Sequence, residues 1–426
     1  MTALPPPQDW SRRRLRFDVR VNPVKSELRL PYDAEVSFVP MDAVGEYGGM
    51  RLEQTKLVGD VYTGYTYFAD GDLCIAKITP CFENGKGALA EGLTNGAAFG
   101  TTELHVIRPN GNLDRRFLFY ISIAHDFRNI GASEMLGAGG QKRVPEEFLK
   151  DWRAPLPPVE TQKRIASFLD EKTAQIDGLV AKKQTLLDRL AEKRQAIITQ
   201  AVTKGLNPAA PMRDSGIEWL GHIPEHWEIK PLKYISPRVT VGIVITPAAY
   251  YSEEGTLALR GLNIKPMGFD LSEVRYISEE GQAINRKSIL REGDLVAVRT
   301  GAPGTTAIVS KELAGCNCID LVIIRRPEVD DPEYIGWYLN SDAAKTQYAL
   351  GSEGALQTHF NVETAGEVVV TLPPPPEQRR IAEEIERALA IHDRQSAIVE
   401  ESVNKLTEYR SALITAAVTG QIEGLR

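Results

Sequence analysis

The sequence predicts an α+β protein in which two mixed α/β domains are separated by two long, antiparallel, coiled-coil-like helices. Three observations carry this prediction. Residues 156–203 and 372–419 repeat one another at a constant offset of 216, without a gap. Both repeated stretches have the pattern of an amphipathic helix. The segments that precede them diverge in sequence and have the pattern of short strands. A long ungapped repeat indicates a two-fold internal duplication, with one domain and one helix in each half.

The duplication divides the chain into four segments. Residues 1–155 and 207–371 are predicted to be globular domains, and residues 156–206 and 372–426 to be long helices. With 426 residues, the chain is long enough for two substantial cores. The globular segments share short matched motifs, which are Pro7-x-x-Trp10 with Pro224-x-x-Trp227, Gly71-Asp72-Leu73 with Gly293-Asp294-Leu295, and Glu103-Leu104 with Asp320-Leu321. Strands are predicted at residues 36–39, 73–78, 104–107, 257–259, 295–299 and 321–324, with Gly and Pro turns between them.

The helical segments each begin after a proline-rich lead, at 155–158 and at 373–376. Proline suits the entry of a helix but not its interior. Apolar residues then recur at steps of three, four and seven, and Gly205 and Gly420 lie where C-terminal caps belong. About forty residues correspond to roughly 60 Å of helix. Because a lone helix of this length exposes its apolar stripe, the two copies are expected to pack on each other.

Composition limits the classes of function. The net charge is −7, and residues 207–371 carry 15 basic and 22 acidic side chains, so no strongly basic module marks a nucleic-acid partner. The four cysteines (Cys74, Cys81, Cys316 and Cys318) are too few for a disulfide framework, which predicts a reducing cytoplasm and small buried thiols. No apolar run approaches the roughly 20 residues of a membrane span, so no membrane partner is expected.

The sequence lacks the common catalytic motifs, although a site assembled from scattered residues stays open. Asn84-Gly85-Lys86-Gly87 does not have the spacing of a phosphate-binding loop. Residues 137–140 are glycine-rich but lead into no helix, which favours a flexible loop. His222-x-x-Glu225-His226 fits a zinc-peptidase pattern, but Pro224 disrupts the helix that this pattern needs. We therefore expect no metal or catalytic site and favour a binding and organising protein.

Three longer motifs resemble the DNA specificity subunit of type I restriction–modification systems. They are the stretches Asp214 to Trp227, Leu372 to Ile381 and Tyr409 to Gly420. The resemblance covers nearly the whole chain, in the order recognition domain, helix, recognition domain, helix. One departure is that the Ser-Gly-Ile-Glu-Trp lead at 215–219 has no counterpart before Pro7.

The resemblance implies a non-catalytic subunit. Each recognition domain would read one half of a split double-stranded DNA target, while the paired helices set the half-site spacing and dock two methyltransferase (modification) subunits. Those subunits would bring S-adenosylmethionine and methylate adenine. Restriction subunits with motor and nuclease activity would bring ATP and Mg²⁺, so no cofactor is expected in this chain. Phosphate attraction supplied by the partners would reconcile DNA binding with the acidic charge.

Residues suited to reading base edges lie at predicted strand ends and in glycine-rich loops. In the first domain they are Lys77, Thr79, Asn84, Lys86, Gln141, Lys142 and Arg143. In the second domain they are Arg260, Asn263, Lys265, Arg299, Thr300, Thr305, Gln357, Thr358 and His359. Each could also be a solvated surface side chain. The basic run at residues 12–16 is either a phosphate contact or a solvated face.

On the helices, four arginines occupy positions expected to face outward, where they either bind the methyltransferase subunits or are simply solvated. They are Arg164, Arg194, Arg380 and Arg410. Tyr409 and the small apolar helix ends at 201–202 and 417–418 are candidates for either partner binding or internal packing. Two other classes of protein stay open: a duplicated scaffold whose domains bind protein, and an enzyme with DNA-modifying chemistry of its own.

Overall fold

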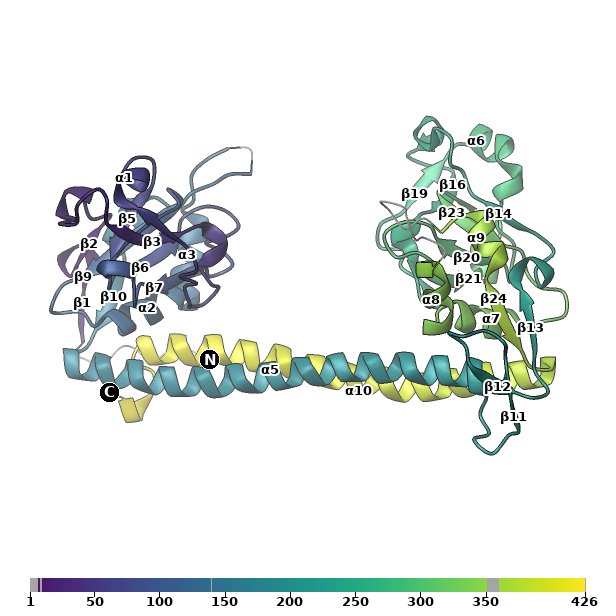
Figure 1. Ribbon diagram of the computed structural model, residues 1–426. Helices are drawn as coiled ribbons and strands as arrows, with labels where there is room; N and C mark the ends of the chain where they lie inside the picture. The colour runs from purple at the N-terminus through teal and green to yellow at the C-terminus, as the bar shows by residue number, and fades with distance from the viewer. Residues whose placement is uncertain (1–6, 8–9, 139, 351–359, 426) are drawn as a thin grey trace. The chain divides into compact units, whose positions relative to one another are not determined.

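The computed structural model describes residues 7, 10–138, 140–350 and 360–425, which form two compact units. Unit 1 comprises residues 1–184 and 400–426, and unit 2 comprises residues 185–399. The two predicted long helices are present as α5 (Val159–Lys204) and α10 (Pro375–Val418), and each contributes one part to either unit (Figure 1). Among the described residues, no helix has the length and apolar character needed to cross a membrane.

Both long helices end at the predicted glycines, where the backbone turns into the left-handed region. The φ angles of Gly205 and Gly420 are 77° and 74°. Each glycine also lies under a Pro-x-x-Trp motif: a Cβ atom on Gly205 would lie 3.2 Å from the ring of Trp227, and one on Gly420 would lie 2.6 Å from Pro7. Glycine is therefore required both by the backbone turn and by the close approach of the packed motif.

The two helices run antiparallel within each unit and are joined by a repeated ion pair. In unit 1, Nε of Arg410 donates to Asp177 at 2.8 Å, and Arg164 donates to the carbonyl of Leu425 at 3.2 Å. In unit 2, Nε of Arg194 donates to Asp393 at 3.2 Å. The offset of 216 converts the pair at 177 and 410 into the pair at 393 and 194. The duplication thus places one equivalent interhelical contact in each unit.

The predicted apolar stripe is buried mainly where a helix lies against its globular domain. Ile165 and Leu169 of α5 join the core of unit 1, and Ile381 and Ile385 of α10 join the core of unit 2. Other stripe residues remain open, since Leu179 is 48% exposed and Leu186 is 44% exposed. Beyond the helix–helix packing that the sequence predicted, the stripe therefore also packs each long helix against its globular domain.

Unit 1 contains two four-stranded sheets, ordered β2-β9-β6-β7 and β4-β3-β8-β5, and a β1-β10 pair. The strands are β1 Ser11–Arg14, β2 Val19–Val21, β3 Glu35–Val39, β4 Thr55–Leu57, β5 Thr66–Ala69, β6 Leu73–Ala76, β7 Gly87–Leu89, β8 Ala97–Gly100, β9 Leu104–Pro109 and β10 Arg153–Leu156. The helices are α1 Val58–Val61, α2 Arg115–Ile123, α3 His125–Ser133 and α4 Glu146–Asp151. All pairings are antiparallel except that of β3 with β8.

Unit 2 repeats the central sheet of unit 1 in the order β14-β23-β20-β21, and β13-β24 repeats β1-β10. A second sheet has the order β15-β19-β16-β22, and β11-β12 and β17-β18 form pairs. The strands are β11 Met212–Asp214, β12 His222–Pro224, β13 Glu228–Pro231, β14 Val239–Val241, β15 Tyr251–Ser252, β16 Thr256–Leu259, β17 Ile264–Lys265, β18 Gly268–Phe269, β19 Arg275–Ile277, β20 Leu295–Val298, β21 Thr306–Ile308, β22 Asn317–Cys318, β23 Leu321–Ile324 and β24 Val369–Leu372. The helices are α6 Glu279–Ile284, α7 Pro332–Leu339, α8 Asp342–Leu350 and α9 Val362–Glu367.

A buried glutamine joins the start of each long helix to its domain. In unit 1, Gln162 donates to the carbonyls of Asn112 and Pro157 and accepts from the amide of Asp114, which caps α2. In unit 2, Gln378 accepts from the amide of Asp331, which caps α7, at 2.8 Å. In both halves, the equivalent glutamine therefore ties the start of the long helix to the N-terminal cap of a domain helix.

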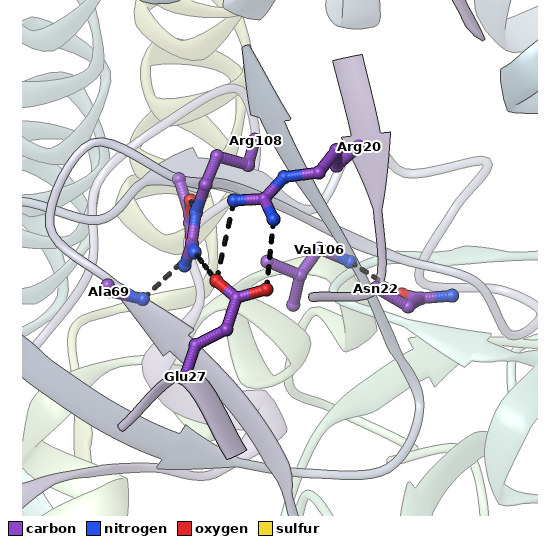
Figure 2. A network of polar contacts seen from close by, with 7 residues as sticks. Arg20, Asn22, Glu27, Ala69, Val106 and Arg108 are labelled. Carbon is purple, nitrogen blue, oxygen red and sulfur yellow. Dashed lines mark hydrogen bonds and ion pairs between the residues drawn. The ribbon is translucent and has the colours of Figure 1, made fainter. Parts of the chain in front are cut away.

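The repeated Gly-Asp-Leu motif supplies a buried carboxylate at the start of each central strand. Asp72 accepts two bonds from the Arg108 guanidinium, both of 2.6 Å, and one from the amide of Ala69. Figure 2 shows the carboxylate of Glu27 between the guanidinium groups of Arg20 and Arg108. Nη1 of Arg108 donates to this carboxylate at 2.5 Å. In unit 2, Asp294 pairs with Arg325 in the equivalent position. These pairs hold the central strands in register.

The cysteines are free thiols, and their burial follows the prediction only in part. Cys74 and Cys318 are fully buried, and burial raises the pKa of both thiols. Cys81 and Cys316 are partly exposed. The His222-x-x-Glu225-His226 pattern begins in strand β12 and continues into a turn, not in a helix, so its two histidines do not share a helical face. Instead, the ring of His226 lies 2.8 Å from Glu377.

Candidate nucleic-acid interface

In both units the same strand ends carry polar side chains. The central strands pair antiparallel, β6 with β9 in unit 1 and β20 with β23 in unit 2. Lys77 follows β6 and its amide donates to the carbonyl of Glu103, just before β9, at 2.9 Å. Arg299 follows β20 and lies beside Asp320, just before β23. We call this region the strand-end surface, comprising residues 77–86, 103, 136–138 and 140–143 in unit 1 and residues 299–305 and 320 in unit 2.

The strand-end surface of unit 1 joins residues that are about 65 positions apart in sequence. The amide of Thr79 donates to the carbonyl of Lys142 at 3.0 Å, and Ile78 forms an antiparallel bridge with Arg143. Gln141 and Lys142 are exposed. Four of the predicted residues (Lys77, Thr79, Lys142 and Arg143) therefore lie together. Asn84 is exposed nearby, while the ammonium of Lys86 is bound to the Met41 carbonyl at 3.2 Å.

Arg143 is held in one orientation by Glu103. Nε and Nη2 of the guanidinium donate to the two carboxylate oxygens, both at 2.8 Å. The backbone of Arg143 exchanges two hydrogen bonds with Leu136, of 2.8 and 3.0 Å. The hydrogen bonds from Arg143 lower the pKa of Glu103. The sequence identified the arginine but not the acid, even though Glu103-Leu104 and Asp320-Leu321 stood out as a repeated pair.

A buried histidine lies behind this surface. His105 donates from Nε2 to the carbonyl of Val144 at 2.8 Å, and its Nδ1 accepts from the amide of Asn22 at 3.3 Å. Burial lowers the pKa of His105 and nearby Lys77 lowers it further, against the opposing effects of the Val144 carbonyl, Glu146 and Glu147. The lowered pKa of His105 favours the neutral ring, whose hydrogen bond to Val144 holds the segment that leads from Arg143 to α4.

We predict that unit 1 loses stability as the pH falls from 7.5 to 5.5. Because the folded-state pKa of His105 lies below the unfolded value of about 6.5, the unfolded chain takes up the proton first, and stability falls with pH. Peroxide oxidation of buried Met135 along a urea titration would report unfolding of unit 1. The midpoint should fall more in the wild type than in His105→Gln. An equal fall in both proteins would contradict the assignment.

In unit 2, Arg299 pairs with Asp320, whose backbone has a left-handed φ of 53°. Nε of Arg299 is buried and has no hydrogen-bond partner among the described residues. Thr300 is exposed, and Thr305 is partly buried, with its carbonyl accepting from the amide of Val298 at 2.9 Å. Gln357, Thr358 and His359 were predicted as base-reading residues and lie outside the described residues.

The predicted residues Arg260, Asn263 and Lys265 lie in a second region of unit 2, where one prediction was wrong. Asn263 is fully buried, donates to the carbonyls of Asp270 and Glu273 at 2.8 Å, and accepts from the amide of Arg260. Its amide is satisfied inside the fold, so its prediction as a base-reading residue was wrong. Arg260 is paired with Glu273 at 3.2 Å and is only 21% exposed. Lys265 is exposed, 3.7 Å from Asp270.

The predicted partner-binding arginines divide into two kinds. Arg194 and Arg410 form the repeated interhelical ion pairs, and Arg410 also lies over the ring of Tyr47 at 5.6 Å. Arg194 and Arg410 therefore make contacts within the chain and are not simply solvated. Arg164 and Arg380 are exposed. The helix ends at 201–202 and 417–418 are buried, which confirms packing for them, whereas Tyr409 is 58% exposed. Whether any of the four arginines binds a partner stays a prediction.

The basic run at residues 12–16 lies on and just after strand β1. Arg13 pairs with buried Asp18, and Arg16 pairs with Asp151, both at 2.5 Å. Arg14 lies 3.6 Å from Asp151, and Arg12 is exposed. Much of this charge is therefore compensated inside unit 1.

The fold defines a duplicated protein whose two α+β domains share a framework and differ in the side chains they present at the strand ends. Residues 34–188 match the profile of the type I restriction modification DNA specificity domain. Over these residues the chain is similar to the specificity subunits of type I restriction–modification systems.

Individual relatives are similar over different shares of the chain. The EcoAI specificity subunit of Escherichia coli is 42% identical over 158 residues, which is 37% of this chain and 27% of that protein. The EcoEI specificity subunit of the same species is 37% identical over 200 residues, 46% of this chain and 33% of that protein. The matched regions thus span a third or less of these two relatives. The putative MjaX specificity subunit of Methanocaldococcus jannaschii is 24% identical and matches 98% of this chain and 94% of its own.

A solved structure supports the fold along nearly the whole chain. It belongs to work on complex assembly and conformational transition of a type I restriction–modification system. Its TM-score is 0.72 at 18% identity, and the match covers 98% of this chain and all of the other. At this identity the likeness concerns the fold alone.

Proposed function

We propose that this chain is the non-catalytic DNA specificity subunit of a type I restriction–modification complex. Each recognition domain reads one half of a bipartite double-stranded target through its strand-end surface. The long helices set the half-site spacing and dock two methyltransferase subunits. Those subunits supply S-adenosylmethionine and methylate adenine, and restriction subunits with ATP and Mg²⁺ join the larger complex.

One observation carries the proposal: two equivalent strand-end surfaces, presented on one repeated framework, bear different side chains. Lys77 in unit 1 is matched by Arg299 in unit 2, and Glu103 is matched by Asp320. A shared framework with divergent surface groups suits the recognition of two different sequences, because base edges in the major groove are distinguished by their donor and acceptor patterns. The repeated helices suit two identical partners, because the same surface occurs twice in one chain.

A domain exchange tests this proposal. We expect that replacing residues 1–155 by the first recognition domain of a relative with a known target changes one half-site and leaves the other half-site and the spacing intact. The measurement is methylome sequencing after co-expression with the cognate methyltransferase. The reciprocal exchange of residues 207–371 should change only the other half-site. A methylated motif that survives both exchanges unchanged would refute the assignment, as would methylation that does not require this chain.

A further inference from the structure

The strand-end surfaces contain a repeated acid that serves two non-equivalent arginines. Glu103 and Asp320 precede the matched strands β9 and β23. In unit 1 the carboxylate binds Arg143, which comes from the loop after α3. In unit 2 the carboxylate binds Arg299, which directly follows β20. By sequence, the counterpart of Arg299 in unit 1 is Lys77, and the counterpart of Arg143 in unit 2 is His359. The acidic residue therefore occurs at the same place in both domains, but its partner arginine comes from a different segment of the chain in each.

The ion pair leaves the part of the guanidinium that recognises guanine available. An arginine has five N–H donors in a fixed planar fork. Arg143 uses Nε–H and one N–H of Nη2 on Glu103. The remaining donors on Nη1 and Nη2 lie on the side of the fork away from the carboxylate. Two adjacent donors of this kind match the O6 and N7 acceptors of guanine in the major groove.

The acid also fixes the direction of the arginine before DNA binds. The bidentate contact holds the side chain of Arg143 in one orientation, so less conformational freedom is lost when a base is bound. Both groups remain reachable, since 43% of the Arg143 side chain and 26% of the Glu103 side chain are exposed. In unit 2, Arg299 is 23% exposed and Asp320 is 51% exposed.

We propose that Glu103 and Asp320 are positioning residues that aim Arg143 and Arg299, respectively, at one guanine in each half-site. This inference rests on the proposed function and adds to it which base is read and how. The acid does not touch the base. It acts by orienting the arginine. Because the arginine comes from a different segment in each domain, the same framework places the guanidinium differently in the two domains.

The test uses the complex with its methyltransferase subunits and a cognate duplex in which each guanine in turn is replaced by 7-deazaguanine. This analogue lacks the N7 acceptor. In the wild type, one position in each half-site should raise the KM for DNA by about tenfold, within the range for a lost bidentate base contact. Glu103→Gln should raise the KM on natural DNA several-fold, leave kcat unchanged, and weaken sensitivity to the analogue in one half-site only. Asp320→Asn should do the same in the other half-site.

Controls separate positioning from a structural role. Glu91→Gln removes the acid from an exposed pair with Arg115, at 3.0 Å on the same unit, and should change neither KM nor the motif. In an Arg143→Ala background, Glu103→Gln should add little, because the two act as one unit. The Glu103→Asp variant should recover part of the lost discrimination.

Each outcome decides a separate point. If the wild-type complex shows no methylation that depends on this chain, the proposed function itself fails. If the wild type methylates a specific target but is insensitive to 7-deazaguanine at every position, the inference is overturned even if the variants do not fold. Unchanged motif and KM in a folded Glu103→Gln protein also overturn it. So does a variant that loses thermal stability while keeping the wild-type pattern of analogue sensitivity.

Discussion

Replacement of Asp294 by asparagine is expected to destabilise unit 2 by roughly 3–5 kcal/mol, the usual cost of breaking a buried ion pair from one side. Asp294 is 2% exposed in its side chain and Arg325 is 11% exposed. The carboxylate also accepts from the amides of Arg291 and Arg326, at 2.8 and 3.1 Å. Asparagine removes the charge and replaces one of the two acceptor oxygens by an NH2 donor, which would face one of these amides. Arg325 would lose the carboxylate that neutralises its charge and keep the neutral carbonyls of Ile289 and Lys287.

Methionine oxidation along a urea titration would measure this effect in the full chain. Met267 packs against the core of unit 2 and Met135 is buried in unit 1, so each reports its own unit. For a unit of this size, the expected loss moves the Met267 midpoint down by roughly 1–2 M urea. The Met135 midpoint should stay unchanged. An unaltered Met267 midpoint would show that the pair contributes little.

The matched substitution in unit 1 provides an internal control. Asp72→Asn should cost less than Asp294→Asn, because Arg108 keeps Glu27 as a second carboxylate at 2.5 Å. Replacing both members of the pair in unit 2, by Asp294→Asn with Arg325→Met, should be milder than Asp294→Asn alone, since no charge is left buried without a partner. Equal losses in Asp72→Asn and Asp294→Asn would mean that Glu27 does not compensate.

The sequence predicted the long helices and central strands because their patterns are local. Steps of three and four residues and the absence of proline marked residues 156–206 as a long helix, which is observed at 159–204. The strand at 321–324 was predicted at its observed bounds. The motif at 71–73 was also visible as a repeat. What it does was not visible, because Arg108 lies 36 positions beyond Asp72 and only strand pairing brings them together.

The same reason explains the error at Asn263 and the missed roles of two arginines. An asparagine at a strand end can either contact a base or, when buried, donate to two backbone carbonyls. Only its burial in the fold distinguishes these roles. For Arg194 and Arg410, the sequence held a usable signal. Asp177 and Asp393 were themselves a repeated pair, and the duplication requires that a contact between Arg194 and Asp393 recurs between Arg410 and Asp177.

The arginine at the end of β20 has the largest expected effect on recognition. Arg299→Ala should lower kcat/KM for methylation of the cognate target by about 5- to 150-fold, which corresponds to roughly 1–3 kcal/mol for a bidentate base contact. The loss should concern one base pair of one half-site, so methylome sequencing should show relaxed discrimination there and nowhere else. Arg275→Ala, which removes an exposed arginine from β19 of the same unit, is the matched control and should leave the motif unchanged.

A second variant separates base reading from charge. In Arg299→Ala, Asp320 loses its cation and its carboxylate would repel nearby phosphates, so part of the loss is electrostatic. Arg299→Ala combined with Asp320→Ala should therefore recover affinity but not discrimination at the affected base pair. Recovery of both would mean that Arg299 only neutralises Asp320. Unchanged methylation in Arg299→Ala would exclude this side chain from base reading, because alanine cannot make the hydrogen bonds of a guanidinium to a base.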